Sequence, residues 1–200
     1  MHEERLVQAG VLCPTRRLRR RCRLSATLFL SGLGLAALGF AAFADPATRL
    51  VWNASASAPI GLYWVDYGAL ARGNLVLVEP PRDARRLAAE RAYLPVGVPL
   101  VKRVAALRGD TVCIVDTAIF IDGRYVAERL ARDRRGRPLP RWTGCRTLAD
   151  DEIFLLMAGV PDSFDGRYFG PIHRSMILGR LVPLWTGASS EREGLVSSFP

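Results

Sequence analysis

The run from Leu24 to Ala44 is the feature that most limits how this chain can fold. It contains 21 residues without a single charge. As a helix, about 20 apolar residues cross the roughly 30 Å hydrocarbon core of a bilayer. Six arginines precede the run and Asp45 follows it. Because cytoplasmic flanks of membrane segments are rich in arginine and lysine, the run predicts a single-pass anchor with its N-terminus in the cytoplasm.

This anchor divides the chain into three predicted segments. Residues 1–23 form a basic cytoplasmic tail, residues 24–44 the transmembrane anchor, and residues 45–200 an extracytoplasmic domain. In a bacterium the anchor would lie in the inner membrane and the domain in the periplasm. The alternative is a cleavable signal peptide, since Ala42-Phe43-Ala44 has the small-x-small form of a cleavage site. The run exceeds the usual apolar core of a signal peptide, about 7–15 residues, so we expect a retained anchor.

The positive charge is concentrated beside the apolar run. The whole chain carries a formal charge of +9. Residues 1–23 hold seven arginines and two glutamates, which is +5, whereas residues 45–200 hold 21 cations and 17 anions, which is +4. More than half of the excess positive charge therefore lies beside the apolar run, where it favours contact with inner membrane lipid. No specific nucleic-acid partner is expected.

The four cysteines divide between the two predicted compartments. Cys13 and Cys22 precede the anchor, where thiols stay reduced, and Cys113 and Cys145 follow it. A Cys113–Cys145 disulfide is therefore expected, with two buried thiols as the alternative. No CxxC spacing is present, and neither a metal nor a cofactor is predicted.

The exported part of the chain has the pattern of a mainly β domain with one short helix. Short apolar segments alternate with turn residues, and residues 82–93 give the one convincing helical pattern. Asp122-Gly123 between apolar flanks predicts a β-hairpin over 118–126. Pro183 is expected to end the last strand. Further strands are expected at 61–65, 74–79, 99–107, 111–115, 152–157 and 174–182.

Residues 129–141 form an arginine-rich segment. They include six arginines and two prolines. The pattern favours an exposed, solvated insertion, and the alternative is a surface that binds DNA or anionic lipid.

The chain has kept a single lysine among its 28 basic residues. Lys102 lies inside the apolar segment 99–107. Arginine does not deprotonate in proteins, whereas a buried lysine can, so Lys102 is suited to act as a neutral-amine base. Its pKa would have to fall about three units from about 10.4 to work near neutrality, and burial produces shifts of that size. The alternatives are a lysine retained by chance in a biased composition, and a histidine base, for which only His173 is on the exported side.

Three sequence blocks follow the anchor, in the order Asn53-x-Ser55-x-Ser57-x-Pro59-x-Gly61-Leu62-Tyr63, Val101-Lys102-Arg103-Val104 through Leu107-x-Gly109-Asp110, and Ser163-Phe164-Asp165-Gly166-Arg167-Tyr168-Phe169-Gly170. In this order behind the anchor, they resemble the TraF-type conjugative-transfer peptidases, relatives of bacterial type I signal (leader) peptidases. The chain departs from leader peptidases at Ala58, where they commonly have methionine. The last block also lacks their Gly-Asp-Asn lead-in, so the conjugative branch is favoured.

The resemblance implies a signal-peptidase-like β domain and a Ser–Lys dyad. Ser57 would be the nucleophile and Lys102 the general base. The backbone N–H of Ser57 and the hydroxyl of Ser55 would form the oxyanion hole. Ser163 would orient the lysine amine through a hydrogen bond.

The resemblance further implies that Asp165 and Arg167 brace the site as an ion pair. Each supporting residue has a structural alternative. Ser55 would only shape a turn, Ser163 would cap one, and the ion pair would lie on the surface, where it contributes little.

The implied function is a membrane-anchored serine endopeptidase that matures an exported precursor, most simply a conjugative pilin precursor. Some relatives also cyclise the trimmed pilin. Two alternatives stay open. One is a general type I signal peptidase, and the other is a non-enzymatic envelope assembly factor of a transfer system.

Overall fold

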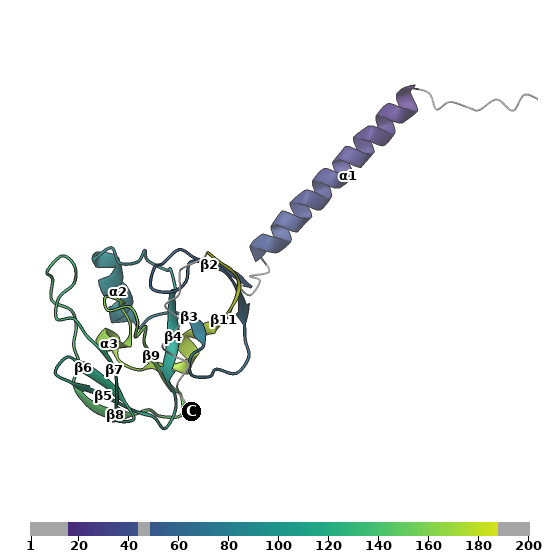
Figure 1. Cartoon of the computed structure of the whole chain (residues 1–200). Coiled ribbons are helices and arrows are strands. Elements are labelled where there is room, and N and C mark those ends of the chain that lie inside the picture. Colours follow the sequence, from purple (N-terminus) through teal and green to yellow (C-terminus); the bar gives the residue numbers. More distant parts are fainter. Residues whose placement is uncertain (1–15, 44–48, 188–200) are drawn as a thin grey trace, which may run out of the picture. The chain divides into compact units, whose positions relative to one another are not determined.

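The computed structural model describes the backbone of residues 16–43 and 49–187, and the side chains of residues 25–41 and 49–187. The chain separates into two compact units, Met1–Ala47 and Thr48–Pro200, which Figure 1 shows. Cys13 and the predicted cleavage position at Ala44 lie outside the described residues.

The described part of the first unit is one helix, α1 (Arg16–Phe43). It begins within the basic tail and continues through the apolar run. Among residues 25–41 and 49–187, no helix combines the length and the apolar character needed to span a membrane.

The described part of the second unit is built mainly of antiparallel strands, which confirms the predicted mainly β class. Its larger sheet has seven strands in the order β1-β2-β11-β3-β4-β9-β10. These are β1 (Leu50–Asn53), β2 (Gly61–Asp66), β3 (Leu75–Val78), β4 (Leu100–Ala106), β9 (Glu152–Leu155), β10 (Ile172–His173) and β11 (Ile177–Thr186).

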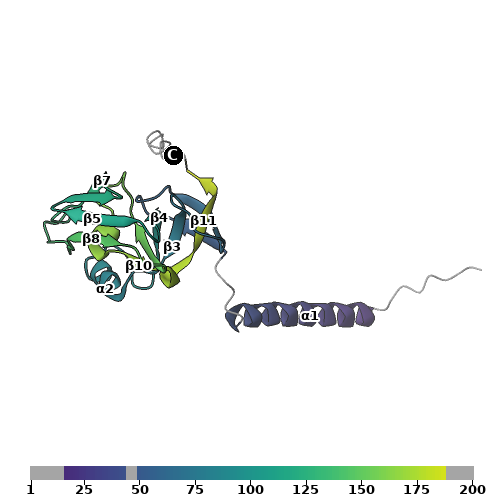
Figure 2. The same cartoon turned by 90° about the horizontal axis from the view of Figure 1, so that it is seen from below.

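A second sheet has four strands in the order β7-β6-β5-β8. Figures 1 and 2 place it at one end of the unit, away from β11. Its strands are β5 (Thr111–Val115), β6 (Ala118–Ile121), β7 (Arg124–Glu128) and β8 (Gly144–Thr147). The predicted hairpin is β6–β7, and Asp122 and Gly123 adopt the positive φ angles of 50° and 76° that its tight turn requires.

Strand alternation distributes the apolar residues between separate clusters. On β3, Leu77 packs in one cluster with Tyr63 and Val101, whereas Val76 and Val78 pack in another. A third cluster lies over the four-stranded sheet. The cluster that contains Leu77 also includes Ala58, the residue after Ser57. The segment that carries Ser57 therefore packs directly against the core.

The soluble helix is shorter than its sequence pattern indicated. Helix α2 (Arg82–Glu90) begins after Pro81 and buries Ala84 and Ala88. It ends before residue 93 because Ala92 has a φ of 56°, which is incompatible with continuing a right-handed helix. Two shorter turns are also present, α3 (Gly166–Phe169) and the 3-10 turn Arg174–Met176.

The expectation that Pro183 ends the last strand is wrong. Strand β11 starts later than expected, at Ile177, and runs through Pro183 to Thr186. Beyond Leu181, β11 is paired with β2 alone, and its register shifts between Pro183 and Trp185. A residue that lacks an N–H is tolerated at such a bulge, where one edge of the strand is not paired.

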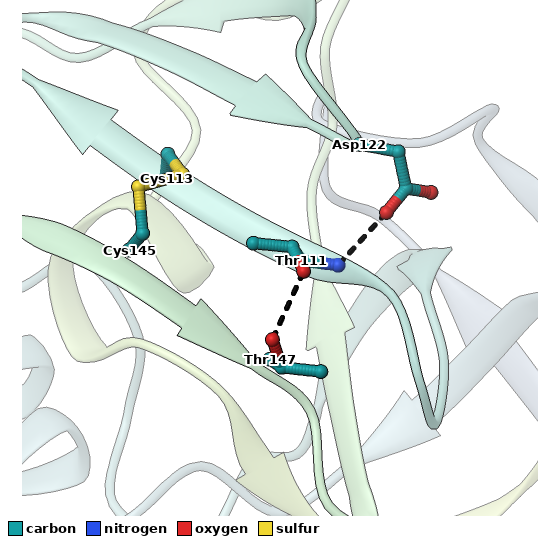
Figure 3. The surroundings of a disulfide bond; sticks show 5 residues. All are labelled: Thr111, Cys113, Asp122, Cys145 and Thr147. Atoms are coloured by element: carbon teal, nitrogen blue, oxygen red, sulfur yellow. Dashed lines mark hydrogen bonds between the residues drawn. A yellow bond between two sulfur atoms is a disulfide. The ribbon is translucent and has the colours of Figure 1, made fainter.

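Cys113 and Cys145 form a disulfide in the four-stranded sheet. They lie opposite each other on β5 and β8, as Figure 3 shows. Thr111 and Thr147 face each other on the same two strands, and their hydroxyl oxygens are 3.0 Å apart. The disulfide therefore fixes β8, whose four residues are all exposed, to the rest of the sheet.

The arginine-rich segment 129–141 is folded around a carboxylate. Asp133 accepts hydrogen bonds from the backbone N–H groups of Arg135 and Arg137, both at 2.9 Å, and from Arg137 Nε at 2.7 Å. The Tyr93 hydroxyl also donates to it. The side chain of Asp133 is only 8% exposed. The segment is largely exposed, as the sequence favoured, but it is an ordered turn around Asp133.

Candidate active site

Ser57 lies in the turn of residues 54–60 that joins β1 to β2. The turn closes where Asn53 pairs with Gly61. A side chain at Gly61 would place its Cβ 2.2 Å from the carbonyl oxygen of Trp185 on β11. Only glycine allows this approach of β11, which accounts for the glycine in the first sequence block.

Lys102 comes from β4, where it pairs with Val76 on β3. The residue is only 3% exposed. Its Nζ donates to Ser57 Oγ at 3.2 Å and to Ser163 Oγ at 2.8 Å. Three blocks that are far apart in the sequence therefore meet at the amine, with the hydroxyls of Ser57 and Ser163 as its partners.

Burial lowers the pKa of Lys102 from its ordinary value of 10.5 to about 8. Removal from water disfavours the charged ammonium, and this is the largest effect. The carboxylates of Asp165 and Asp162 act in the opposite direction, and the guanidinium of Arg167 lowers the pKa further. A substantial fraction of the amine is therefore neutral at mildly alkaline pH and able to accept a proton.

The hydroxyl of Ser55 lies beside that of Ser57. Ser55 Oγ is 2.9 Å from Ser57 Oγ, and it accepts a hydrogen bond of 3.3 Å from the backbone N–H of Ser57. The two donors that would form an oxyanion hole thus lie next to each other, and in this state they are bonded to each other. A carbonyl oxygen of a substrate would have to replace that bond.

Asp165 and Arg167 form a fully buried ion pair behind the site. Both are 0% exposed, and Arg167 Nε donates to Asp165 Oδ1 at 3.0 Å. Asp165 Oδ2 also accepts from the backbone N–H of Met157 at 3.0 Å. The guanidinium donates to four backbone carbonyls, those of Glu128, Met157, Val160 and Pro161. The alternative of a surface pair is therefore wrong, because this pair ties the wall around Ser163 to the core.

The short helix α3 allows this wall to pack closely. Asp165 caps it by accepting from the N–H of Arg167 at 3.2 Å. A Cβ at Gly166 would lie 2.6 Å from the carbonyl oxygen of Leu155 and 2.7 Å from the ring of Phe154. Glycine is therefore required for α3 to approach β9, and the third sequence block has a packing explanation.

His173 is not part of this arrangement. Its Nδ1 lies 2.7 Å from Asp151 Oδ2, and its side chain is 59% exposed. The hydrogen bonds of Ser57 in the described structure go to Ser55 and Lys102. Within residues 25–41 and 49–187, no group of three His, Cys, Asp or Glu side chains could hold a metal ion.

Two residues of the first sequence block had no role assigned from the sequence but contact the turn of residues 54–60 that carries Ser57. Asn53 and Tyr63 both donate to the carbonyl oxygen of Pro59, at 3.0 Å and 2.6 Å. Their place in the block, on either side of Ser57, was the available signal. What the sequence could not indicate is that their partners are backbone atoms.

A serine hydroxyl hydrogen-bonded to a buried amine of lowered pKa fits the class of serine hydrolases that use lysine as the base. Comparison with known proteins agrees with that class. The family model described as signal peptidase, peptidase S26, matches residues 22–185. The chain therefore belongs to the signal peptidase family, peptidase S26.

Several similar proteins are of the TraF type, as the sequence blocks indicated. A plasmid transfer protein TraF of Escherichia coli is 34% identical over 181 residues, which are 82% of this chain and 96% of the relative. A second protein of that name from Escherichia coli is 38% identical over 149 residues, 67% of this chain and 81% of the relative. A conjugal transfer protein TraF of Agrobacterium fabrum is 36% identical over 145 residues, with the same coverage.

One solved structure is also similar. It is a signal peptidase I from Enterococcus faecalis, which is 20% identical and has a TM-score of 0.36. The match covers 58% of this chain and all of that chain.

Proposed function

We propose that the chain is a membrane-anchored serine endopeptidase with a Ser57–Lys102 dyad, and that it matures an exported precursor protein. The observation that carries this proposal is the 3.2 Å hydrogen bond between Lys102 Nζ and Ser57 Oγ, made by an amine whose pKa burial lowers to about 8. A neutral amine at this distance can remove the serine proton as the hydroxyl attacks.

In the proposed reaction, Ser57 Oγ bonds to the carbonyl carbon of the scissile peptide and its proton moves to Lys102 Nζ. The negative oxygen that develops accepts from the N–H of Ser57 and the hydroxyl of Ser55, once these have separated from each other. The proton then passes to the leaving nitrogen, the C–N bond breaks, and an acyl ester remains on Ser57.

A water molecule, or the amino terminus of the trimmed chain, attacks the acyl ester in the second step. Lys102 takes a proton from the attacking group and returns it to Ser57. Hydrolysis gives a free carboxylate, whereas aminolysis gives a cyclic chain. Ser163, whose Oγ accepts from Lys102 at 2.8 Å, would orient the amine throughout.

The proposed substrate is a pilin-like precursor of a conjugative transfer system. The names of the relatives, plasmid transfer protein and conjugal transfer protein, support this choice. The precursor would have small residues before the scissile bond and bind as an added strand beside the site.

We propose the bacterial inner membrane as the location, with the domain in the periplasm. The uncharged run 24–44 supports an anchor. The outer side of β1, β2 and β11 also exposes three tryptophans, Trp52, Trp64 and Trp185, which are 56%, 40% and 58% exposed. Tryptophan is enriched where proteins meet the membrane surface, so this side of the domain would suit work close to the lipid.

The test is co-expression of a pilin precursor from the same genetic neighbourhood with wild type, Ser57→Ala or Lys102→Arg, followed by intact-mass spectrometry of the pilin. A mass loss with wild type alone would support the dyad, and a further loss of one water would indicate cyclisation. Trimming of ordinary secretory precursors would favour a general signal peptidase instead. If cells that carry Ser57→Ala still carry out conjugative transfer normally, a non-enzymatic assembly factor would be favoured.

A further inference from the structure

Asn53 has the densest set of contacts to the turn that carries Ser57. It is 4% exposed and lies at the end of β1. Its Nδ2 donates to three backbone carbonyls of the turn, those of Ser55 at 3.1 Å, Ala58 at 3.1 Å and Pro59 at 3.0 Å. Its Oδ1 accepts from the backbone N–H of Ser55 at 3.0 Å.

The orientation of this amide follows from its surroundings. Three carbonyl oxygens on one side can only accept, so they require the NH₂ group, and the N–H on the other side requires the oxygen. Because an NH₂ group has two hydrogens, at least one of them is shared between two acceptors. Asparagine is therefore the one small residue whose donors and acceptor match both sides.

The turn itself has little backbone support. The one backbone hydrogen bond described inside residues 54–60 runs from the N–H of Ala58 to the carbonyl of Ser55, and at 3.4 Å it is long. Asn53 holds the carbonyls of these same two residues, which flank Ser57 on either side. The carbonyls on either side of Ser57 are thus held by an amide that lies outside the turn.

A second side chain secures the far end of the turn. The hydroxyl of Tyr63, which is 0% exposed, donates to the carbonyl of Pro59 at 2.6 Å. That carbonyl consequently accepts from both Asn53 and Tyr63. Asn53 acts on the whole turn, whereas Tyr63 acts on its last residues alone, so the two should differ in effect.

We propose that Asn53 is a positioning residue, which holds the 54–60 turn so that the Ser57 hydroxyl faces Lys102 while the Ser57 N–H and the Ser55 hydroxyl face one reacting oxygen. This inference rests on the proposed function. It assigns to Asn53 an effect on the transition state, because misplacing a nucleophile by about 1 Å can cost about 100-fold in rate. Binding of the uncleaved substrate would change little.

The first test compares Asn53→Ala and Asn53→Asp with Asn74→Ala. The chain has only two asparagines. Asn74 also holds a turn, accepting from the N–H of Ala71 at 2.9 Å, but it makes no contact with the site in the described structure, so it is a matched control. Asn53→Asp keeps the size of the side chain and its acceptor but turns a carboxylate toward three carbonyl oxygens.

The readouts are the kinetics with which the full chain in detergent cleaves the precursor, and its affinity for an inhibitor. The inhibitor is acetyl-Ala-Phe-Ala aldehyde, whose adduct with Ser57 places an oxyanion in the hole, and its reference is the corresponding alcohol, which forms no adduct. For both Asn53 variants we expect kcat and aldehyde affinity to fall together, roughly 10- to 100-fold, with KM and alcohol affinity within about twofold of wild type. Asn74→Ala should match wild type in kcat, KM, aldehyde affinity and alcohol affinity.

If the role of Asn53 were merely structural, its variants would have a smaller active fraction, and their affinities for the aldehyde and the alcohol would fall equally. That result would overturn the proposal. Wild-type kcat in Asn53→Asp would overturn it as well, because the donors would then be dispensable. Tyr63→Phe removes one hydrogen bond to the turn and should lower kcat less than either Asn53 variant does. An equal or larger loss of kcat in Tyr63→Phe would indicate that Tyr63, and not Asn53, positions Ser57.

A readout that needs no catalysis separates this inference from the proposed function. Hydrogen exchange of the peptide covering residues 54–60 should be faster in Asn53→Ala than in wild type and unchanged in Asn74→Ala, because the N–H of Ser55 loses its acceptor. If wild type cleaves no precursor yet this exchange pattern holds, the peptidase proposal fails and the positioning of the turn stands. Unchanged exchange in Asn53→Ala would overturn the positioning whatever the activity.

Discussion

Lys102 Nζ lies 3.2 Å from Ser57 Oγ, although 45 positions separate the two residues in the chain. The serine is brought there by a turn between β1 and β2, and the lysine by β4, which lies between β3 and β9 in the larger sheet. Strand pairing holds β4, which carries Lys102, on both sides, whereas the turn is held largely by side-chain hydrogen bonds. This difference determines which substitutions should change chemistry and which should change stability.

The pH dependence of cleavage should follow the Lys102 amine. We expect kcat/KM to rise about tenfold per pH unit below pH 8 and to level off above it, because only the neutral amine can accept the serine proton. Since the chain has one lysine, ¹³C-labelled lysine gives a single NMR signal whose titration measures the same pKa directly. A rate that already levels off below pH 7 would indicate another base.

Burial of Lys102 should cost the folded state stability at neutral pH. Its pKa is about 8 when folded and near 10.5 when unfolded. Between these values the unfolded chain holds a proton that the folded chain has released, so stability rises with pH in this window. Below pH 8 the full cost is present, at most about 3 kcal/mol.

Lys102→Met, which keeps the length but cannot be charged, should therefore be more stable than wild type at pH 7 and equal to it near pH 10.5. Urea unfolding of the full chain in detergent, followed by tryptophan fluorescence at both pH values, measures this difference. A variant that is less stable than wild type at pH 7 would show that the hydrogen bond to Ser163 outweighs the loss of hydration.

Much of the fold could be predicted because local chemistry determines it. The Asp122-Gly123 turn required positive φ angles, and the strand around Leu77 alternates between two apolar clusters. Strand β8 was missed because all four of its residues are exposed, so no alternation marks it. Pro183 was misinterpreted because the number of partners that a strand has is a property of the sheet, not of the local sequence.

Part of the geometry of the candidate site could be expected from residue type. The single lysine in an apolar segment is buried, and its amine contacts two serines of the sequence blocks, whereas its role as a base stays a prediction. The contacts of Asn53 could not be predicted, because its partners are backbone carbonyls that appear only when the turn has formed. The ordered turn in segment 129–141 was missed for a similar reason. A count of charges does not show that Asp133 accepts hydrogen bonds from backbone N–H groups.

Replacing Arg167 by lysine should destabilise the domain strongly. The ion pair with Asp165 is fully buried, and lysine cannot reproduce the planar set of donors that reaches four carbonyls. We expect a loss of about 3–5 kcal/mol in the free energy of unfolding. Arg180→Lys is the matched control, because Arg180 pairs with Asp66 where both side chains are about one third exposed. Its loss should stay below about 1 kcal/mol, and equal losses would contradict a special role for burial.

Removing the disulfide should lower stability without changing the chemistry. Cys113 and Cys145 are 32 positions apart, and a loop of that length gives an entropic stabilisation of about 3–4 kcal/mol. The bond joins β5 to β8 in the four-stranded sheet, whereas Ser57 and Lys102 belong to the larger sheet and its turn. The double variant Cys113→Ser, Cys145→Ser should therefore unfold at lower urea concentration, while kcat of the folded fraction stays within about twofold of wild type. Cys13→Ser with Cys22→Ser is the control for thiol loss and should leave both properties unchanged. A large fall in kcat of the folded disulfide variant would mean that the two sheets are coupled at the site.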